Sequence, residues 1–170
     1  MRNSRFAFFV LPILFALVLC AAVPARALDE VAASAGRFRV SDNDHISEGG
    51  LEIRLAPHRF RWLPQRVSFV PAFGVMVNSD SSYYGYGSFR FEIPLSERWQ
   101  VTPQLGYGLY DRNGGFNLGG QVEFRSGLEV TRQLGERYRL GLIFYHLSNA
   151  GIYVHNPGSE SLVLTFAYRL

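Results

Sequence analysis

The sequence predicts an all-β protein, namely an eight-stranded antiparallel transmembrane β-barrel of the outer membrane. Three features of the 170-residue chain predict this fold. Apolar and polar residues alternate along most of the chain after residue 30, which is the period of an extended strand. The polar face of these segments mixes Gly and other small residues with Arg and Glu, as the filled interior of a narrow barrel requires. The apolar face is edged by Trp and Tyr, which suits lipid and its two interfaces.

Residues 1–27 predict a secretory signal peptide. Arg2 and Arg5 form a positive start, residues 6–22 are a nearly unbroken apolar run, and Ala25-Arg26-Ala27 is a small-x-small cleavage pattern. Pro12 interrupts the run, which favours a cleaved signal over the alternative of a retained transmembrane helix. We therefore expect residues 28–170 to form a single barrel domain.

The charges divide at the same boundary. All 17 basic residues are Arg, and removal of the three in the leader leaves 14 Arg against 14 Asp and Glu. Basicity therefore gives no reason to expect a nucleic-acid partner. Cys20 is the only cysteine and lies in the leader, so the mature chain offers no thiol for a disulfide, a metal or catalysis.

Eight segments of the mature chain follow the alternating pattern or its close variants. The first four are residues 31–41, 48–56, 66–78 and 82–93, where the apolar side includes Phe38 and Val40, then Leu51 and Ile53, then the odd positions from 67 to 77, then Phe89 and Phe91. The last four are residues 98–109, 119–132, 136–148 and 159–170. Turn-forming residues separate them at 41–44, 78–81, 111–115 and 156–158.

An even number of strands places both termini on the periplasmic side and makes the first, third, fifth and seventh turns extracellular. The short turns at 94–97 and 133–135 suit the periplasmic side, whereas the connection at 57–65 is long for that side and the pattern gives no reason for it. Charged residues on the polar faces predict an ion network that fills the barrel, with the members Glu52, Arg54, Arg90, Glu92, Glu123, Arg125, Glu129 and Arg139.

Three polar residues break the apolar face at the end of the last hairpin. His146 and Ser148 continue the even, apolar face of segment 136–148, and Glu160 begins the even, apolar face of segment 159–170. Residues two apart on a strand share a face with about 7 Å between their α-carbons, and hairpin pairing can bring Glu160 beside His146. A nucleophile, a base and an acid that orients the base are the minimal set for acyl transfer.

The alternative is that these residues have no catalytic role, because His and Ser also occur at the rim of a barrel for other reasons. The other three histidines are not expected to join such a site. His45 and His155 lie in solvated turns, and His58 lies on the periplasmic side of the barrel. No spacing of His, Asp and Glu suggests a metal site, and no Gly-rich loop has a phosphate-binding context. The chain is therefore expected to use no metal or cofactor.

The segment His146-Leu147-Ser148-Asn149-Ala150-Gly151, followed by Asn156-Pro157-Gly158-Ser159-Glu160, resembles the hallmark of the lipid A 3-O-deacylases, the PagL family of acyloxyacyl hydrolases. The resemblance is specific over residues 144–160. It implies an outer membrane serine esterase of Gram-negative bacteria that removes the 3-hydroxyacyl chain at position 3 of lipid A without a metal.

The resemblance also implies roles for individual residues: Ser148 as nucleophile, His146 as general base and Glu160 as the residue that orients His146. Asn149, Gly151 and Asn156 are candidate oxyanion donors by their closeness to Ser148. The partner is then lipid A in the outer leaflet, with the active site towards the extracellular side. A non-catalytic adhesive or envelope-stabilising barrel and a palmitoyl-transfer barrel are the alternatives, and a homodimer and the acyl-length preference stay open.

Overall fold

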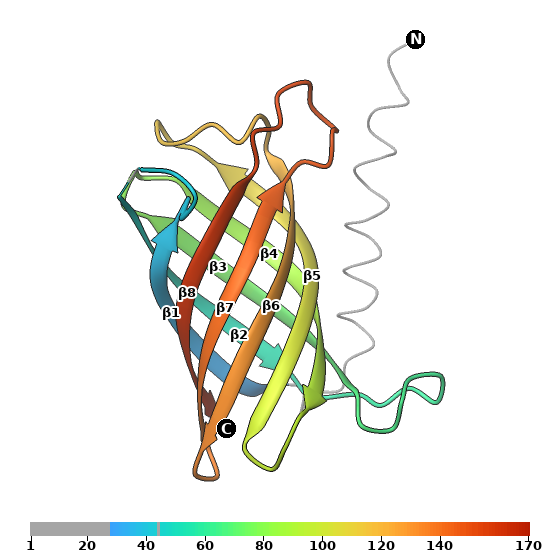
Figure 1. The fold of residues 1–170 in the computed structure, drawn as a ribbon. Coiled ribbons are helices and arrows are strands. Elements are labelled where there is room, and N and C mark those ends of the chain that lie inside the picture. Colours follow the sequence, from blue (N-terminus) through green and yellow to red (C-terminus); the bar gives the residue numbers. More distant parts are fainter. Residues whose placement is uncertain (1–27, 44) are drawn as a thin grey trace.

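Eight β-strands follow one another around a closed antiparallel barrel, in which β1 pairs with both β2 and β8 (Figure 1). The computed structural model describes residues 28–43 and 45–170, so the predicted signal peptide lies outside the described residues. The strands are β1 (Leu28–Phe38), β2 (Ile46–Leu55), β3 (Ser68–Asn78), β4 (Tyr83–Pro94), β5 (Trp99–Asp111), β6 (Val122–Leu134), β7 (Tyr138–Ser148) and β8 (Ser159–Arg169). The lower end of the barrel in Figure 1 is the end where β1 begins and β8 finishes, and the opposite end is the upper end. The predicted fold class is confirmed.

Two strand boundaries differ from the sequence prediction for identifiable backbone reasons. β1 covers residues 28–38 and not 31–41, because Arg39 adopts a positive φ of 55° that turns the chain out of the strand. β6 begins at Val122 and not at residue 119, since Gly119 has a φ of 100° and belongs to the preceding loop. The prediction that Phe38 and Val40 share one apolar strand face is wrong. Phe38 is fully buried inside the barrel, and Val40 lies beyond the end of β1.

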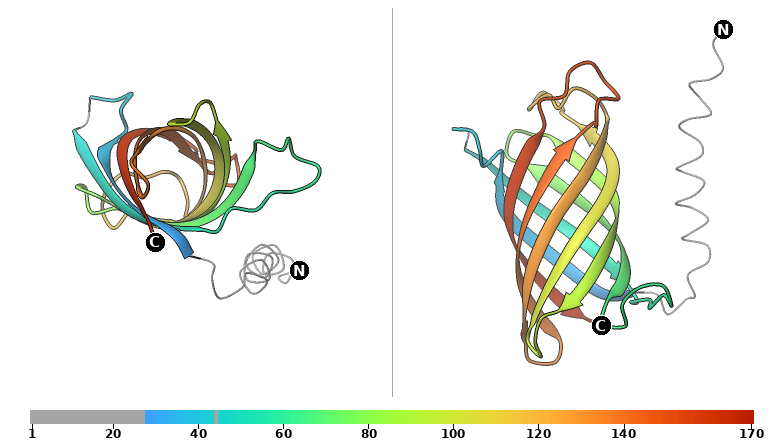
Figure 2. Two further views of the ribbon diagram at one scale, coloured as in Figure 1. Left: turned by 90° about the horizontal axis from the view of Figure 1, so that it is seen from below. Right: turned by 45° about the vertical axis from the view of Figure 1, so that its right-hand side comes forward.

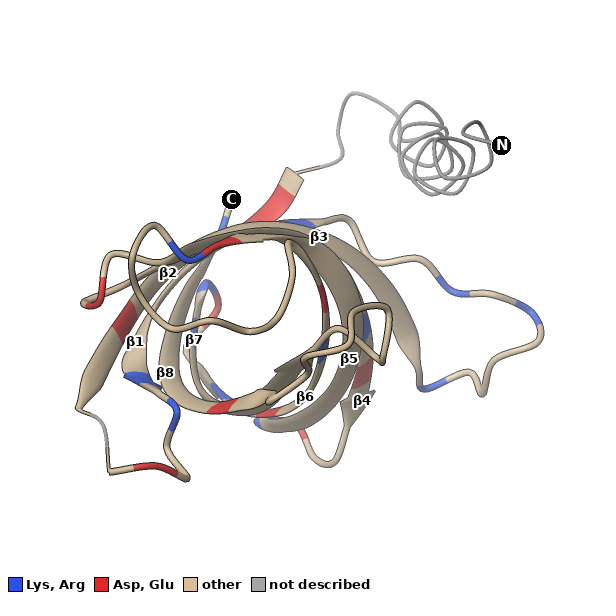
Figure 3. Ribbon diagram, turned by 90° about the horizontal axis from the view of Figure 1, so that it is seen from above, with Lys and Arg blue, Asp and Glu red and all other residues tan. Residues whose placement is uncertain are grey.

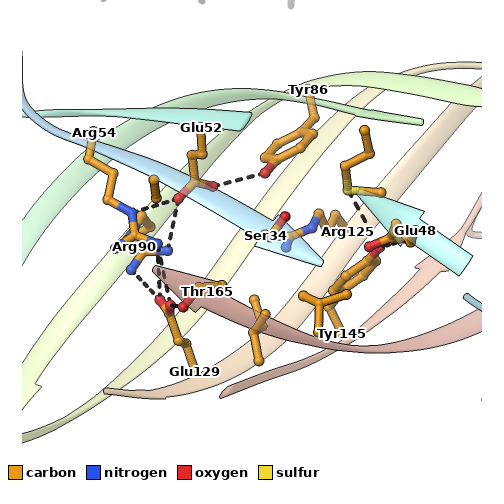
Figure 4. Close-up of a pocket in the computed structure, with 14 residues that line it drawn as sticks. Ser34, Glu48, Glu52, Arg54, Tyr86, Arg90, Arg125, Glu129, Tyr145 and Thr165 are labelled. Carbon is orange, nitrogen blue, oxygen red and sulfur yellow. Dashed lines mark hydrogen bonds and ion pairs between the residues drawn. The ribbon is translucent and has the colours of Figure 1, made fainter. Parts of the chain in front are cut away.

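The lower half of the barrel interior holds most of the predicted ion network, and Figure 4 shows its members Glu52, Arg54, Arg90 and Glu129. Arg54 lies at its centre, with guanidinium nitrogens 2.7 Å from Glu30, 2.7 Å from Glu52 and 3.3 Å from Glu129. Further ion pairs join Arg90 to Glu52 and Glu129, and Arg139 to Glu30 and Glu92. A cavity of about 20 Å³ lies among these side chains and their neighbours, which is room for about one water molecule. The interior is therefore filled by paired charges, as expected for a barrel of this size.

Two members of the predicted network behave differently. Arg125 stacks over the rings of Tyr86 and Tyr145, 4.8 Å and 4.2 Å from their centroids, and donates a hydrogen bond to Gln104. Both carboxylate oxygens of Glu123 are buried without a hydrogen-bond partner among the described residues. Arg125 and Glu123 therefore lie in the interior without joining the ion-pair network.

An aromatic and aliphatic core fills the upper half of the interior, where the sequence pattern predicted mainly small and charged residues. Its buried members are Phe38, Met76, Tyr84, Tyr86, Tyr110, Leu118, Ile143, Tyr145, Leu147 and Val163. Their burial supplies a conventional hydrophobic core at that end of the barrel. The strands that carry the candidate site are packed against this core, because Tyr145 and Leu147 of β7 are both fully buried in it.

The outer surface is apolar along most of the strands. Leu105, Leu142 and Leu164 are among many large apolar side chains that are roughly half exposed or more. Trp99 and Tyr138 stand at the start of their strands near the lower end, as aromatic residues do at a membrane interface. Among the described residues, no helix has the length and apolar character needed to span a membrane.

Candidate active site

His146 and Glu160 face each other across the β7–β8 pair at the upper end of the barrel. The two residues are direct partners in the strand register, and His146 Nδ1 lies 3.0 Å from Glu160 Oε1. Their side chains are 39 % and 33 % exposed, so both are open to the barrel exterior and to solvent. The alternation of β7 causes this placement, because Tyr145 and Leu147 on either side of His146 point into the core. The predicted His–Glu contact is therefore present.

Ser148 is the last residue of β7 and shares the outward face with His146. It is partly exposed, and the hydrogen bonds within residues 28–43 and 45–170 do not include one between Ser148 and His146. A second serine, Ser126 of β6, pairs directly with His146 on its other side. Antiparallel partners have α-carbons about 4.5–5.5 Å apart, which is closer than the roughly 7 Å between alternate residues of one strand. Two serines are therefore within reach of the imidazole.

The second carboxylate oxygen of Glu160 is held from the opposite side by the β1–β2 turn. Ser41 Oγ donates a hydrogen bond of 3.0 Å to Glu160 Oε2, and Val40 N donates one of 2.9 Å to the backbone oxygen of Glu160. The carboxylate is thus fixed between Ser41 and His146. The sequence analysis did not identify Ser41, because 119 residues separate it from Glu160 and only barrel closure brings them together.

The β7–β8 loop, residues 149–158, is organised around the fully buried side chain of Asn149. Its Nδ2 donates to the backbone oxygens of Leu118 and His155, at 3.1 Å and 2.9 Å, and its Oδ1 accepts a hydrogen bond from Gly151 N. Asn156 Oδ1 in turn accepts a hydrogen bond of 3.0 Å from Asn149 N, beside Ser148. The three residues expected around Ser148 therefore do lie together, and the Asn149 amide is fully used in holding the loop.

Gly158 lies directly against the imidazole of His146. A β-carbon at this position would be 2.8 Å from His146 Cε1 and 3.3 Å from Nε2, and the residue has a φ of 70°. The loop end therefore packs on the edge of the ring that carries Nε2. This contact leaves Nδ1 to Glu160 and limits how far the ring can tilt.

The remaining histidines do not join the site. His58 lies beyond β2 at the lower end, where its Nδ1 is 2.8 Å from the backbone oxygen of Ala56. His155 is exposed in the β7–β8 loop and contributes its backbone oxygen to Asn149. Within the described part of the chain, no group of three or more His, Cys, Asp and Glu could hold a metal ion.

Comparison with known proteins connects this geometry to a family. The family model for the lipid A 3-O-deacylases (PagL) matches residues 62–169, a stretch that contains His146, Ser148 and Glu160. The comparison with curated protein sequences gives no significant match.

Solved structures share the architecture. The crystal structure of the outer membrane enzyme PagL matches with a TM-score of 0.63 and 18 % identity, over 81 % of this chain and 97 % of that one. A de novo designed transmembrane β-barrel matches with a TM-score of 0.60 and 11 % identity, over 85 % and 96 % of the two chains. The outer membrane protein Ail of Yersinia pestis has a TM-score of 0.50 and 13 % identity, over 84 % and 99 %. At these identities the structures show a common fold, whereas the family match covers more than half of the sequence, and we conclude that this chain belongs to the lipid A 3-O-deacylase (PagL) family.

Proposed function

We propose that this protein is an outer membrane serine esterase that removes the ester-linked 3-hydroxyacyl chain from position 3 of lipid A. The observation that carries the proposal is the His146–Glu160 hydrogen bond, with Ser148 on the same outward face. Family membership supplies the substrate and the reaction. The contacts of these residues support the roles proposed for them.

His146 acts as the general base in this mechanism. Its Nδ1–H donates to Glu160, which fixes the tautomer and leaves Nε2 as the nitrogen that accepts a proton. Ser148 Oγ gives its proton to Nε2 and attacks the ester carbonyl of the acyl chain. The imidazolium then protonates the sugar oxygen as the ester C–O bond breaks. Water, with the same His146 as base, attacks the acyl-enzyme, which releases the fatty acid and restores Ser148. Glu160 stays ionised and stabilises the positive ring.

Substrate binding is expected to bring Ser148 and His146 into hydrogen-bond contact, since catalytic hydrogen bonds are often loose before substrate arrives. Ser126 is the competing neighbour of His146. Ser148 is favoured because the polar groups of Asn149, Gly151 and Asn156 gather beside it.

We assign the oxyanion hole to the loop that follows Ser148. Asn156 is the best donor, because its Oδ1 is held by Asn149 N and its Nδ2 has no partner among the described residues. Gly151 N donates to Asn149 Oδ1 and would join after a small change in the turn. Asn149 contributes by positioning both. A preorganised donor at the developing oxyanion typically changes kcat by about 10²–10³-fold.

The position of the site fits a lipid substrate. His146 and Glu160 lie on the outer wall of the barrel, and the next outward pair towards the lower end is Phe144 with Leu162, which are 47 % and 40 % exposed. An acyl chain can follow this apolar wall while its ester lies at the polar rim. We infer that the upper end is extracellular, because lipid A occupies the outer leaflet and both termini then lie on the periplasmic side.

Mass spectrometry of lipid A from cells with and without the protein tests the activity. Cells with the native chain should lose one 3-hydroxyacyl chain, and the Ser148→Ala and His146→Ala variants should restore the full mass. In purified enzyme each variant should lower kcat by about 10⁴-fold or more. Heat-modifiable migration on gels checks that the variant barrels are folded.

Ser126→Ala is the matched control, because it removes the same hydroxyl from the other neighbour of His146. This variant should keep native activity. Deacylation that survives Ser148→Ala but disappears in Ser126→Ala would overturn the assignment of the nucleophile. A lipid A of unchanged mass in the presence of well-expressed native barrel would overturn the activity itself.

A further inference from the structure

The connection between β2 and β3, residues 56–67, extends sideways from the lower end of the barrel and not along its axis (Figure 2). Backbone hydrogen bonds fix its form: His58 and Phe69 exchange two of 2.8 Å, Leu63 N donates to Phe60 O at 3.1 Å, and Val67 N donates to Pro64 O at 2.8 Å. A periplasmic turn of a barrel is normally short. This loop is long and has an ordered backbone, so we looked for a function of its side chains.

The loop is strongly basic. It carries Arg59, Arg61 and Arg66, and the sequence has no Asp or Glu between Glu52 and Asp80. All three Arg side chains are exposed, and none forms an ion pair with the described residues of the chain. Figure 3 shows the basic positions along this loop without an acidic one. A charge-balanced barrel therefore concentrates unpaired positive charge at one lateral point.

Aromatic rings lie beside these charges and continue onto the barrel wall. The rings of Phe60 and Trp62 stack with centroids 5.5 Å apart, Phe60 packs on Phe69 at 5.4 Å, and Phe69 packs on Phe89 at 5.4 Å. Trp62 is 74 % exposed although it is the larger ring. The loop thus continues the aromatic surface of the barrel wall, and Trp62 is its more exposed ring.

A hollow on the loop combines both kinds of side chain. It is lined by Arg59, Phe60, Arg61, Leu63, Pro64 and Gln65. Two guanidinium groups with an amide donor suit a phosphate diester, to which Arg binds in a bidentate manner. The apolar members of the lining suit the glycerol and upper acyl region below such a phosphate.

We propose that residues 56–67 form a docking site for anionic glycerophospholipids of the leaflet at the lower end of the barrel. Arg59 and Arg61 bind the headgroup phosphate, and Trp62 with Phe60 lies at the boundary between headgroups and acyl chains, where aromatic rings are favoured. The sideways projection places the loop over neighbouring lipids and not over the barrel mouth. In the proposed orientation this leaflet is the periplasmic one, which contains no lipid A, so the docking site is separate from the catalytic substrate site.

Trp62 provides a direct reporter, because the chain has two tryptophans and Trp99→Phe leaves Trp62 alone. The full barrel with Trp99→Phe is reconstituted in phosphatidylcholine vesicles that contain brominated phosphatidylglycerol or, at the same content, brominated phosphatidylcholine. We expect Trp62 fluorescence to be quenched several-fold more strongly by the brominated phosphatidylglycerol. Adding Arg59→Gln and Arg61→Gln should abolish this preference.

The matched control is Arg98→Gln with Arg137→Gln, which removes two exposed guanidinium groups at the same end of the barrel. This control should keep the preference, and its loss there as well would overturn the proposal in favour of general charge attraction. Equal quenching by both brominated lipids would also overturn it. Deacylase activity in detergent micelles should be unchanged by Arg59→Gln with Arg61→Gln, so the two proposals fail independently.

Discussion

Gly158→Ala is the substitution that most directly tests how His146 is positioned. The added β-carbon would be 2.8 Å from His146 Cε1, whereas ordinary van der Waals contact begins at 3.4 Å, so the ring or the loop must shift by about 0.6 Å. A misplacement of about 1 Å can lower a catalytic rate by roughly 10²-fold, so we expect about a tenfold fall in kcat for this smaller shift. The positive φ of 70° adds a cost of about 1–2 kcal/mol in stability.

Gly135→Ala separates the two effects. Gly135 has nearly the same φ, 77°, and a β-carbon there would meet nothing within 4 Å. Both variants should therefore lose similar stability in denaturant unfolding of the refolded barrel, but only Gly158→Ala should lose kcat in a deacylation assay with purified lipopolysaccharide. Equal kcat in the two variants would refute the argument that Gly158 limits the position of the imidazole.

Three further predictions concern residues around and below the site. Ser41→Ala should lower kcat about fivefold with KM unchanged, because it removes one hydrogen bond, worth about 1 kcal/mol, from Glu160. Ser41→Thr should restore kcat if the hydroxyl positions Glu160. Asn156→Asp keeps an acceptor for Asn149 N but removes the side-chain NH donor, so kcat should fall about 10²-fold or more. The unfolding midpoint should equal that of the native chain. A fall in stability with kcat unchanged would show that Asn156 holds the loop and does not bind the oxyanion. Glu129→Gln leaves two buried Arg partners without their shared carboxylate and should lower the free energy of unfolding by about 3–5 kcal/mol. Glu136→Gln, at an exposed position, is the control. An effect no larger than that of the control would contradict a structural role for the ion network.

Much of the fold can be predicted from the alternation of apolar and polar residues along each strand. Strands of a membrane barrel alternate between lipid and interior, so parity alone predicts that His146, Ser148 and Glu160 share the outer face, and the structure has all three on it. The same rule predicts that Arg54, Glu52 and the other charges lie inside, where most of them form ion pairs. The direct pairing of His146 with Glu160 depends on the register of the β7–β8 hairpin, and alternation excludes only shifts by an odd number of residues.

Features that depend on distant parts of the chain could not be predicted in this way. Alternation groups Phe38 with Val40, but a positive φ at Arg39 ends the strand between them, and Arg39 is not a typical turn residue. Ser41 reaches Glu160 only because β1 and β8 close the barrel. The anchoring of Asn149 by Leu118 O likewise depends on how two loops meet above the barrel.

Closure of the barrel next to the site explains how an exposed pair of side chains can be held rigidly. Gly36 of β1 allows this closure, because a β-carbon there would be 2.3 Å from the backbone oxygen of Leu162 in β8. Close contact of these strands carries the β1–β2 turn onto Glu160, while Leu147 anchors β7 in the interior core. His146 is therefore fixed by Glu160 on one side, by Gly158 on another and by a strand whose alternate residues are buried. The contacts that hold His146 therefore come from both sides of the barrel wall: the interior core anchors β7, and Glu160 and Gly158 hold the imidazole on the outer face.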